Sequence, residues 1–135
     1  MTLILTPLEN AINSLNIAFV EYQKDNSNEF VRDSVIQRFE YTYELCIKML
    51  KRYLELNASS KGEVDLMSFN DIIRKSNIKG LLDGNLEDWQ KYRDMRNITS
   101  HTYDVEKAIM VIDIVDEFLY EAEFLLNKLK EKCLD

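Results

Sequence analysis

Helix-breaking residues are scarce in this sequence. Its 135 residues include three glycines, Gly62, Gly80 and Gly84, and one proline, Pro7. Strand-rich domains need frequent turns, and turns depend on glycine and proline for their backbone angles. A chain with so few of either residue is therefore expected to form long helices.

Apolar residues at helical spacing predict where those helices lie. The first helix has Thr6 as its expected cap, Pro7 at its first helical position and Glu9 in a capping box. Its apolar stripe recurs with the period of a helix. The stripe consists of Leu8, Ala11, Ile12, Leu15, Ala18, Phe19 and Tyr22.

The same pattern predicts further helical segments. They are a long helix over residues 29–57, a short one over 69–77, a medium one that begins at residue 86, and a last long helix from residue 105 to near the C-terminus. Ser68, Asn85 and Asp104 are placed to cap the last three. The apolar stripe of the last helix is unbroken, so we expect that helix to be continuous.

No segment shows the alternation typical of a β-strand. We therefore predict an all-α fold, an up-and-down four-helix-bundle-like arrangement with a short extra helix. The length suits a single domain that spans residues 1–135. A domain of this size can bury about two-thirds of its unfolded surface, so it needs no stapling by disulfides or metals.

The formal net charge of −7 argues against general nucleic-acid binding. Contacts to phosphate supply most non-specific affinity, so an acidic chain needs a local basic patch to hold RNA. The best candidate lies on the second helix and consists of Arg38, Lys48, Lys51 and Arg52. Two interpretations stay open for this run, a contact to RNA or a partner and a merely solvated face.

The cysteines and the hydropathy pattern indicate a cytoplasmic protein. Cys46 and Cys133 form no metal-ligand pattern, and Cys46 falls on an apolar stripe, so it is expected to be a buried hydrophobe. Nothing indicates a disulfide scaffold, which favours a reducing compartment. The opening MTLIL is too short for a signal peptide, and no apolar run reaches the roughly 18 residues of a membrane span.

Motifs for nucleotide or metal chemistry are missing. No glycine stands in a P-loop setting, and a single histidine allows no zinc signature. A row of carboxylates on the last helix has two interpretations, a magnesium site and a solvated face, of which the second is favoured because most of them lie opposite the apolar stripe. These are Asp113, Asp116, Glu117, Glu121 and Glu123. We expect neither a metal nor a cofactor.

The stretch MRNITSHTYD, residues 95–104, contains the only histidine, His101, with Arg96 five positions before it. Imidazole has a pKa of about 6.5 and can move protons near neutrality. Guanidinium binds phosphate oxygens and stays charged. Together they supply the minimum for RNA cleavage without metal, proton transfer by histidine and charge stabilisation by arginine.

Helical geometry limits this pair. Five residues at about 100° each place Arg96 and His101 roughly 140° apart on a straight helix. They can converge only if the helix breaks between them or if two chains meet at this edge. Thr99 and Ser100 are weak helix formers and favour a break. If the helix continued instead, Asn97 would share a face with His101 and could orient its imidazole.

The wider sequence resembles a known family. RFEYTYELCIKMLKRYLE, residues 38–55, is followed by Trp89, by MRNITSHTYD and by a long amphipathic helix. This closely resembles, over nearly the whole chain, the nucleotidyltransferase substrate-binding family of the HEPN superfamily, which is close to the HepT toxins. Arg96, Asn97 and His101 match the R-x4–6-H motif of that superfamily, and His101 to Tyr103 matches the H-x-Y extension of the HepT type.

The resemblance implies a four-helix-bundle-like homodimer with Arg96 and His101 near a cleft between the subunits. It also implies a complex with a minimal nucleotidyltransferase, an MntA-like antitoxin. HepT-type members look like metal-independent ribonucleases, toxins that the partner silences by transferring AMP to the tyrosine of H-x-Y, here Tyr103. In an older interpretation, the protein is the substrate-binding subunit of its catalytic partner.

Three hypotheses follow. The protein is a regulated ribonuclease toxin, or a non-cleaving subunit that presents a substrate to a transferase, or a helical dimerisation adaptor with no small-molecule role. Tyr103 is either the modified residue or a packing residue at a helix start. Trp89 and Tyr92 either stack bases or pack in the core, and core packing is favoured.

Overall fold

The computed structural model describes residues 3–60 and 62–133. These residues form six α-helices, two short 3₁₀-helices and no strand. The elements in chain order are α1 (Thr6–Lys24), α2 (Glu29–Leu56), η1 (Val64–Leu66), α3 (Phe69–Ile78), α4 (Leu86–Asn97), η2 (Thr99–His101), α5 (Val105–Asp113) and α6 (Val115–Cys133). The predicted all-α class is thereby confirmed. None of the helices in the described ranges is long and apolar enough to cross a membrane.

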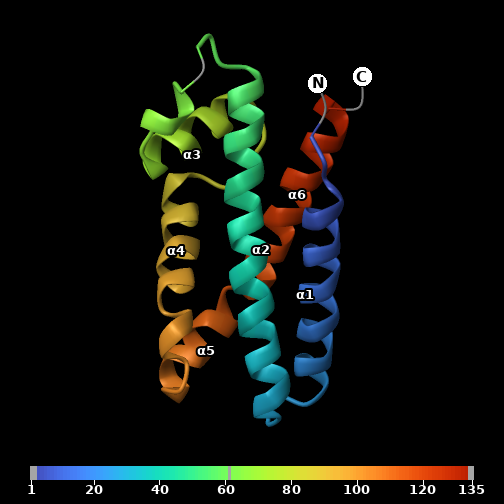
Figure 1. Ribbon diagram of the computed structural model, residues 1–135. Coiled ribbons are helices and arrows are strands. Elements are labelled where there is room, and N and C mark those ends of the chain that lie inside the picture. The colour runs from blue at the N-terminus through green and yellow to red at the C-terminus, as the bar shows by residue number, and fades with distance from the viewer. Residues whose placement is uncertain (1–2, 61, 134–135) are drawn as a thin grey trace.

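Helix α2 is the central element of the bundle. Figure 1 shows α1 running antiparallel along one side of α2, with α6 next to α1. On the other side of α2, α4 runs downward beneath the shorter α3, and α5 leads behind α2 to α6. The four-helix-bundle-like arrangement therefore consists of α1, α2, α4 and α6, with α3 as the short extra helix.

Three of the four expected helix caps form. Ser68 and Asn85 begin α3 and α4 with complete capping boxes, and the Asp104 side chain accepts the N–H of Glu106 at the start of α5. The expected Thr6 cap is wrong, because α1 begins one residue earlier than predicted. Leu5 occupies the cap position and contributes no side-chain hydrogen bond.

The last helix is not continuous, contrary to expectation. It divides at Ile114 into α5 and α6, and the N–H of Ile114 donates to the carbonyl of Val111 at 3.2 Å, a tighter pattern than an α-helix. No glycine or proline marks the break. It falls inside a run of β-branched residues that are buried on both sides of it. The change of direction lets both halves bury their apolar faces against α2.

Aromatic rings fill the middle of the core. Phe118 of α6 packs edge-on against Phe39 of α2 at 4.9 Å between ring centroids and against Tyr92 of α4 at 5.3 Å. Trp89 is fully buried beside them. Such edge-to-face contacts contribute about 0.5–1.5 kcal/mol each beyond area burial. Trp89 and Tyr92 are therefore core residues, as favoured, and are not free to stack on bases.

The start of α1 and the end of α6 lie side by side. Lys130 of α6 forms an ion pair with Glu9 of α1 at 3.3 Å. In Figure 1 both elements begin or end at the top of the molecule, whereas the turn that carries His101 lies at the bottom. The start of α1 and the end of α6 are thus remote from the MRNITSHTYD stretch.

Candidate functional site

The helix break expected between Arg96 and His101 is present. Helix α4 ends at Asn97, where the N–H of Ile98 donates to the carbonyls of Asp94 and Met95, and the 3₁₀-turn η2 then carries His101. The N–H of His101 donates to the carbonyl of Ile98 at 2.9 Å, which closes this turn. The straight-helix separation of about 140° between the two side chains therefore does not apply.

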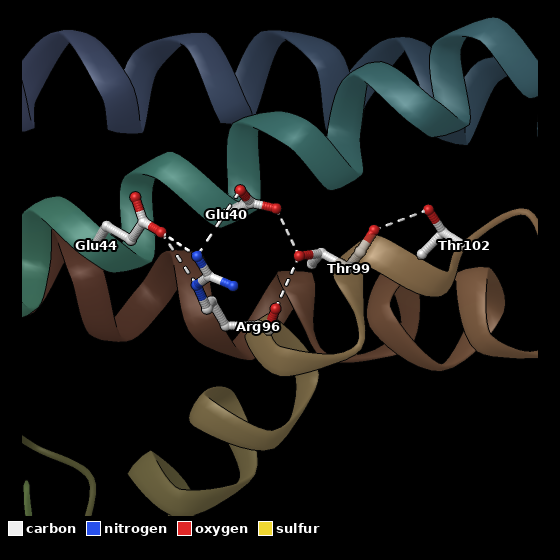
Figure 2. A network of polar contacts seen from close by, with 5 residues as sticks. All are labelled: Glu40, Glu44, Arg96, Thr99 and Thr102. Carbon is white, nitrogen blue, oxygen red and sulfur yellow. Dashed lines mark hydrogen bonds and ion pairs between the residues drawn. The ribbon is translucent and has the colours of Figure 1, made fainter.

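Arg96 points across to α2 and meets two carboxylates. Its Nε donates to Glu44 at 3.1 Å, its Nη2 pairs with the same carboxylate, and Glu40 lies 3.9 Å from Nη2 (Figure 2). The hydrogen bond to Glu44, more than the proximity of Glu40, raises the pKa of Arg96 above its ordinary value. The guanidinium is thus permanently charged and, in the single chain, already occupied.

A threonine ties the 3₁₀-turn to the same carboxylates. The Thr99 hydroxyl lies 2.5 Å from Glu40 and 2.7 Å from the carbonyl of Arg96, and its proton can serve either acceptor. The Thr102 hydroxyl donates to the carbonyl of Thr99 at 3.1 Å (Figure 2). Glu40 consequently holds both the arginine and the turn that carries His101.

His101 and Tyr103 project from this turn into solvent. Their rings lie 6.2 Å apart at a steep mutual angle, and Tyr103 is 85% exposed. Asn97 is exposed as well. Among the described residues no hydrogen bond links the imidazole to Arg96 or to Asn97, so the orienting role expected for Asn97 stays a prediction. An exposed imidazole and phenol are available for proton transfer and for modification.

The four basic residues of α2 do not form one patch. Arg38 turns toward α1 and donates to the carbonyl of Ser14 at 2.8 Å. Lys48 is exposed, Arg52 lines a hollow at the far end of α2, and Lys51 lines a small cavity between α2, α3 and α4. Of the four, Lys51 lines a cavity that Arg93 of α4 also lines.

Glu121 is the most deeply buried carboxylate described, with 3% of its surface exposed. It accepts the backbone N–H groups of Asp83 and Gly84 at 3.0 and 2.8 Å and the indole N–H of Trp89 at 3.4 Å. Burial raises the pKa of Glu121, and these hydrogen bonds partly oppose that shift. The expectation of a solvated face is therefore wrong for Glu121, which fastens α6 to the loop that begins α4.

A family model described as nucleotidyltransferase substrate binding protein like matches residues 3–131. The chain belongs to this family. Curated and solved proteins agree with that assignment. A Haemophilus influenzae protein named probable ribonuclease HepT is 41% identical over 136 residues, which cover 95% of this chain and 92% of that protein.

Two solved structures show the same fold. One, from Haemophilus influenzae and described as revealing the fold of a substrate binding domain of a nucleotidyltransferase, matches with a TM-score of 0.88 at 39% identity, over 94% of this chain and 99% of that chain. A protein from Thermus thermophilus matches with a TM-score of 0.72 at 29% identity, over 91% of this chain and 98% of the other. Similarity to a nucleotidyltransferase substrate-binding fold thus extends over nearly the whole chain.

Sequence reasoning missed two residues around the family motif. These are Glu44, which pairs with Arg96 rather than with Lys48 one turn away, and Glu40, which lies beside the same guanidinium. A signal was available, because Glu40 and Glu44 are four positions apart and therefore share a face of α2. No comparable signal existed for Glu121, because its donors come from a loop nearly forty positions earlier.

Proposed function

We propose that this protein is a metal-independent ribonuclease in which Arg96 and His101 carry the chemistry. The observation that carries the proposal is the exposed His101 imidazole on a turn that Thr99 fastens to Glu40, a carboxylate that also contacts Arg96. Similarity to a protein named probable ribonuclease HepT supports it. His101 would transfer protons at the 2′-hydroxyl or the leaving oxygen, and Arg96 would stabilise the charge that develops at phosphorus.

The reacting unit is proposed to be a homodimer. In the single chain the guanidinium of Arg96 is engaged by Glu40 and Glu44, so a phosphate has to displace a carboxylate. A second copy that meets the first at this edge brings a second exposed His101 to the cleft. Sedimentation analysis should therefore show a dimer at the concentrations used for activity, and a monomer would contradict this part of the proposal.

Cleavage of a single-stranded RNA in EDTA tests the ribonuclease assignment. Replacing His101 with alanine should lower the rate roughly 10²–10⁴-fold, the usual size of general acid–base catalysis. Replacing Arg96 with alanine should lower it about 10²–10³-fold, as loss of a charge-stabilising donor does. Ser100→Ala, an exposed neighbour on the same turn, is the matched control. Equal rates for the His101 variant and the control would exclude the mechanism.

We further propose that a nucleotidyltransferase partner, acting as an antitoxin, transfers AMP from ATP to Tyr103. The phenol oxygen loses its proton and bonds to the α-phosphorus, and pyrophosphate leaves. The phenol is 85% exposed and stands beside His101. The resulting phosphodiester would carry a negative charge that Arg96 can bind, and the nucleoside would block RNA entry. Incubation with the partner and labelled ATP should label the wild type and Tyr120→Phe equally, since Tyr120 is also exposed but lies on α6. A Tyr103→Phe variant that still gains AMP stoichiometrically contradicts the assignment.

A second candidate function is a binding subunit that presents a substrate to its transferase and cleaves nothing. Two observations favour it, the description of a solved relative as a substrate binding domain and the carboxylates that occupy Arg96. In that case the partner complex binds nucleotide while purified protein leaves RNA intact in every variant. The cleavage assay above separates the two functions directly.

A further inference from the structure

A small cavity lies between α2, α3 and α4, about one turn of α4 away from Arg96. Its volume is about 220 Å³, below the roughly 300–1,000 Å³ of pockets that enclose drug-sized ligands. It is lined by Ile47, Lys51, Met67, Phe69, Ile72 and Arg93. A space of this size suits one flat ring or one nucleotide unit rather than a larger ligand.

Two cations stand at the edge of this cavity without carboxylate partners. Lys51 of α2 and Arg93 of α4 are exposed, and neither joins an ion pair within the described residues. The Arg93 guanidinium lies over the Phe69 ring, 4.7 Å from its centroid. This cation–π contact positions the guanidinium and leaves its donors free. Two cations without ion pairs and an apolar floor therefore meet at one small cavity.

The cavity and the Arg96 site lie one after the other along the side where α2 and α4 pack together. Along α2, the residues Glu40, Glu44, Ile47 and Lys51 recur at helical spacing and face α4. Along α4, Arg93 lies one turn before Arg96. Lys51 is about 10 Å from Glu44 along the helix axis, at about 1.5 Å per residue. An RNA strand that places one phosphate at Arg96 can therefore place a nearby nucleotide of the same strand in the cavity.

We propose that this cavity binds a nucleotide of a single-stranded RNA that runs from Arg96 along the side formed by α2 and α4. Lys51 and Arg93 contact its phosphate, and its base occupies the apolar floor beside the guanidinium plane held by Phe69. Bases stack readily on arginine planes and aromatic rings, and this contact tolerates any sequence. The choice of RNA as ligand rests on the proposed ribonuclease function, whereas the phosphate and planar-ring chemistry rests on the cavity itself.

Fluorescence anisotropy with a labelled single-stranded RNA, methylated at every 2′-hydroxyl to prevent cleavage, tests the site. Lys51→Gln and Arg93→Gln should each weaken binding about fivefold to tenfold and reduce the salt dependence of binding, because each removes a phosphate contact. Arg74→Gln on α3 and Lys128→Gln on α6 make the same charge change outside the cavity and should bind as the wild type does. Equal losses in all four variants would overturn the proposal.

Phe69→Leu separates stacking from charge. It keeps an apolar side chain while removing the ring under Arg93, so binding should weaken by about tenfold with an unchanged salt slope. A circular-dichroism melt confirms that the variant is folded. An unchanged affinity for Phe69→Leu, with normal loss for the two cation variants, would overturn the stacking part and leave a phosphate site alone.

The outcomes for the cavity and for catalysis are distinguishable. Pocket-dependent binding without any cleavage supports the cavity while the ribonuclease proposal fails. Cleavage that requires His101, with RNA binding insensitive to the Lys51 and Arg93 substitutions, refutes the cavity proposal while the ribonuclease proposal stands.

A competition experiment uses 5′-AMP. If AMP binds with the same variant dependence and the RNA binds no more tightly than AMP, the ligand is a free nucleotide and the RNA assignment is overturned.

Discussion

Carboxylates serve two opposite purposes in this protein. Glu40 and Glu44 lie at the surface of α2, where they position the Arg96 guanidinium, which remains partly open to solvent. Glu121 lies inside the core, where backbone and indole N–H groups replace its hydration. A phosphate from solvent could replace the carboxylates on Arg96, whereas no ligand can reach the buried Glu121, whose role is structural.

The free energy of unfolding should fall when Glu121 is replaced with glutamine. One carboxylate oxygen faces the N–H of Asp83 and the indole, and the other faces the N–H of Gly84, so an amide turns a donor toward a donor on one side. Leaving such a buried group unpaired costs about 1–3 kcal/mol. Urea denaturation measures the loss, and Glu123→Gln, an exposed neighbour, should change little.

The effect of this substitution should also depend on pH. Burial raises the pKa of Glu121 above its unfolded value of 4.5, so the folded state keeps the proton longer. Between 4.5 and the raised pKa, stability from this group falls as pH increases, because folding then requires a proton that the unfolded chain has released. The gap between wild type and Glu121→Gln should narrow as the pH of the urea titration rises from 4.5. If the difference in unfolding free energy widened instead, the pKa of Glu121 would not be raised in the folded state.

Cys46 should resist thiol reagents in the folded protein. Its side chain is fully buried, and burial raises the pKa of its thiol, so the reactive thiolate is scarce. Cys133 is only partly buried and should react first. Titration with a chromogenic disulfide should therefore count one reactive thiol in native protein and both in urea. Two fast-reacting thiols in native protein would show that α2 is mispositioned.

At the scale of elements, local chemistry predicted most helix starts and failed where distant packing decides. Ser68 and Asn85 each have an acidic residue three positions on, and both capping boxes form. The division at Ile114 has no local marker, because it results from burial on both sides of a β-branched run. The helical period places Glu40 and Glu44 on one face of α2, but it does not identify α4 as the helix that packs against that face, so it does not predict their pairing with Arg96.

The cap of α4 should matter for the site as well as for stability. Replacing Asn85 with alanine removes the bond to the N–H of Asp88 and should cost about 1 kcal/mol, as cap losses usually do. Ser68→Ala at α3 provides a matched cap loss on a helix that carries neither Arg96 nor His101, and cleavage is compared at saturating RNA because α3 also carries Phe69 of the proposed cavity. Equal destabilisation is expected by urea denaturation, while RNA cleavage should decline only for Asn85→Ala, at temperatures close to its melting point.

At the scale of the whole molecule, every α-helix contributes to one apolar core. Composition and period predicted that class, because a chain poor in glycine and proline has few alternatives. In the proposed homodimer, the contact between two copies would depend on surface shape, which composition and helical period do not give. The same limit explains why the candidate site was predicted as residues and not as a geometry.

If residues 1–135 form a single domain, unfolding should be cooperative. Trp89 is the only tryptophan and is fully buried, so its fluorescence reports the core, while circular dichroism at 222 nm reports the helices. Melting curves from the two probes should coincide, as they do for two-state domains. Separate midpoints would show that α3 and α4 unfold independently of α1, α2 and α6.

The pairing of Glu9 with Lys130 has a practical use. It joins the beginning of α1 to the end of α6 at one pole, while the segment between α4 and α5, which contains Tyr103, lies at the other (Figure 1). Fluorescent reporters fused at either end should therefore leave the Tyr103 pole open to a transferase. Energy transfer between a donor fluorophore at one of these fused ends and an acceptor on the transferase would then follow docking in real time.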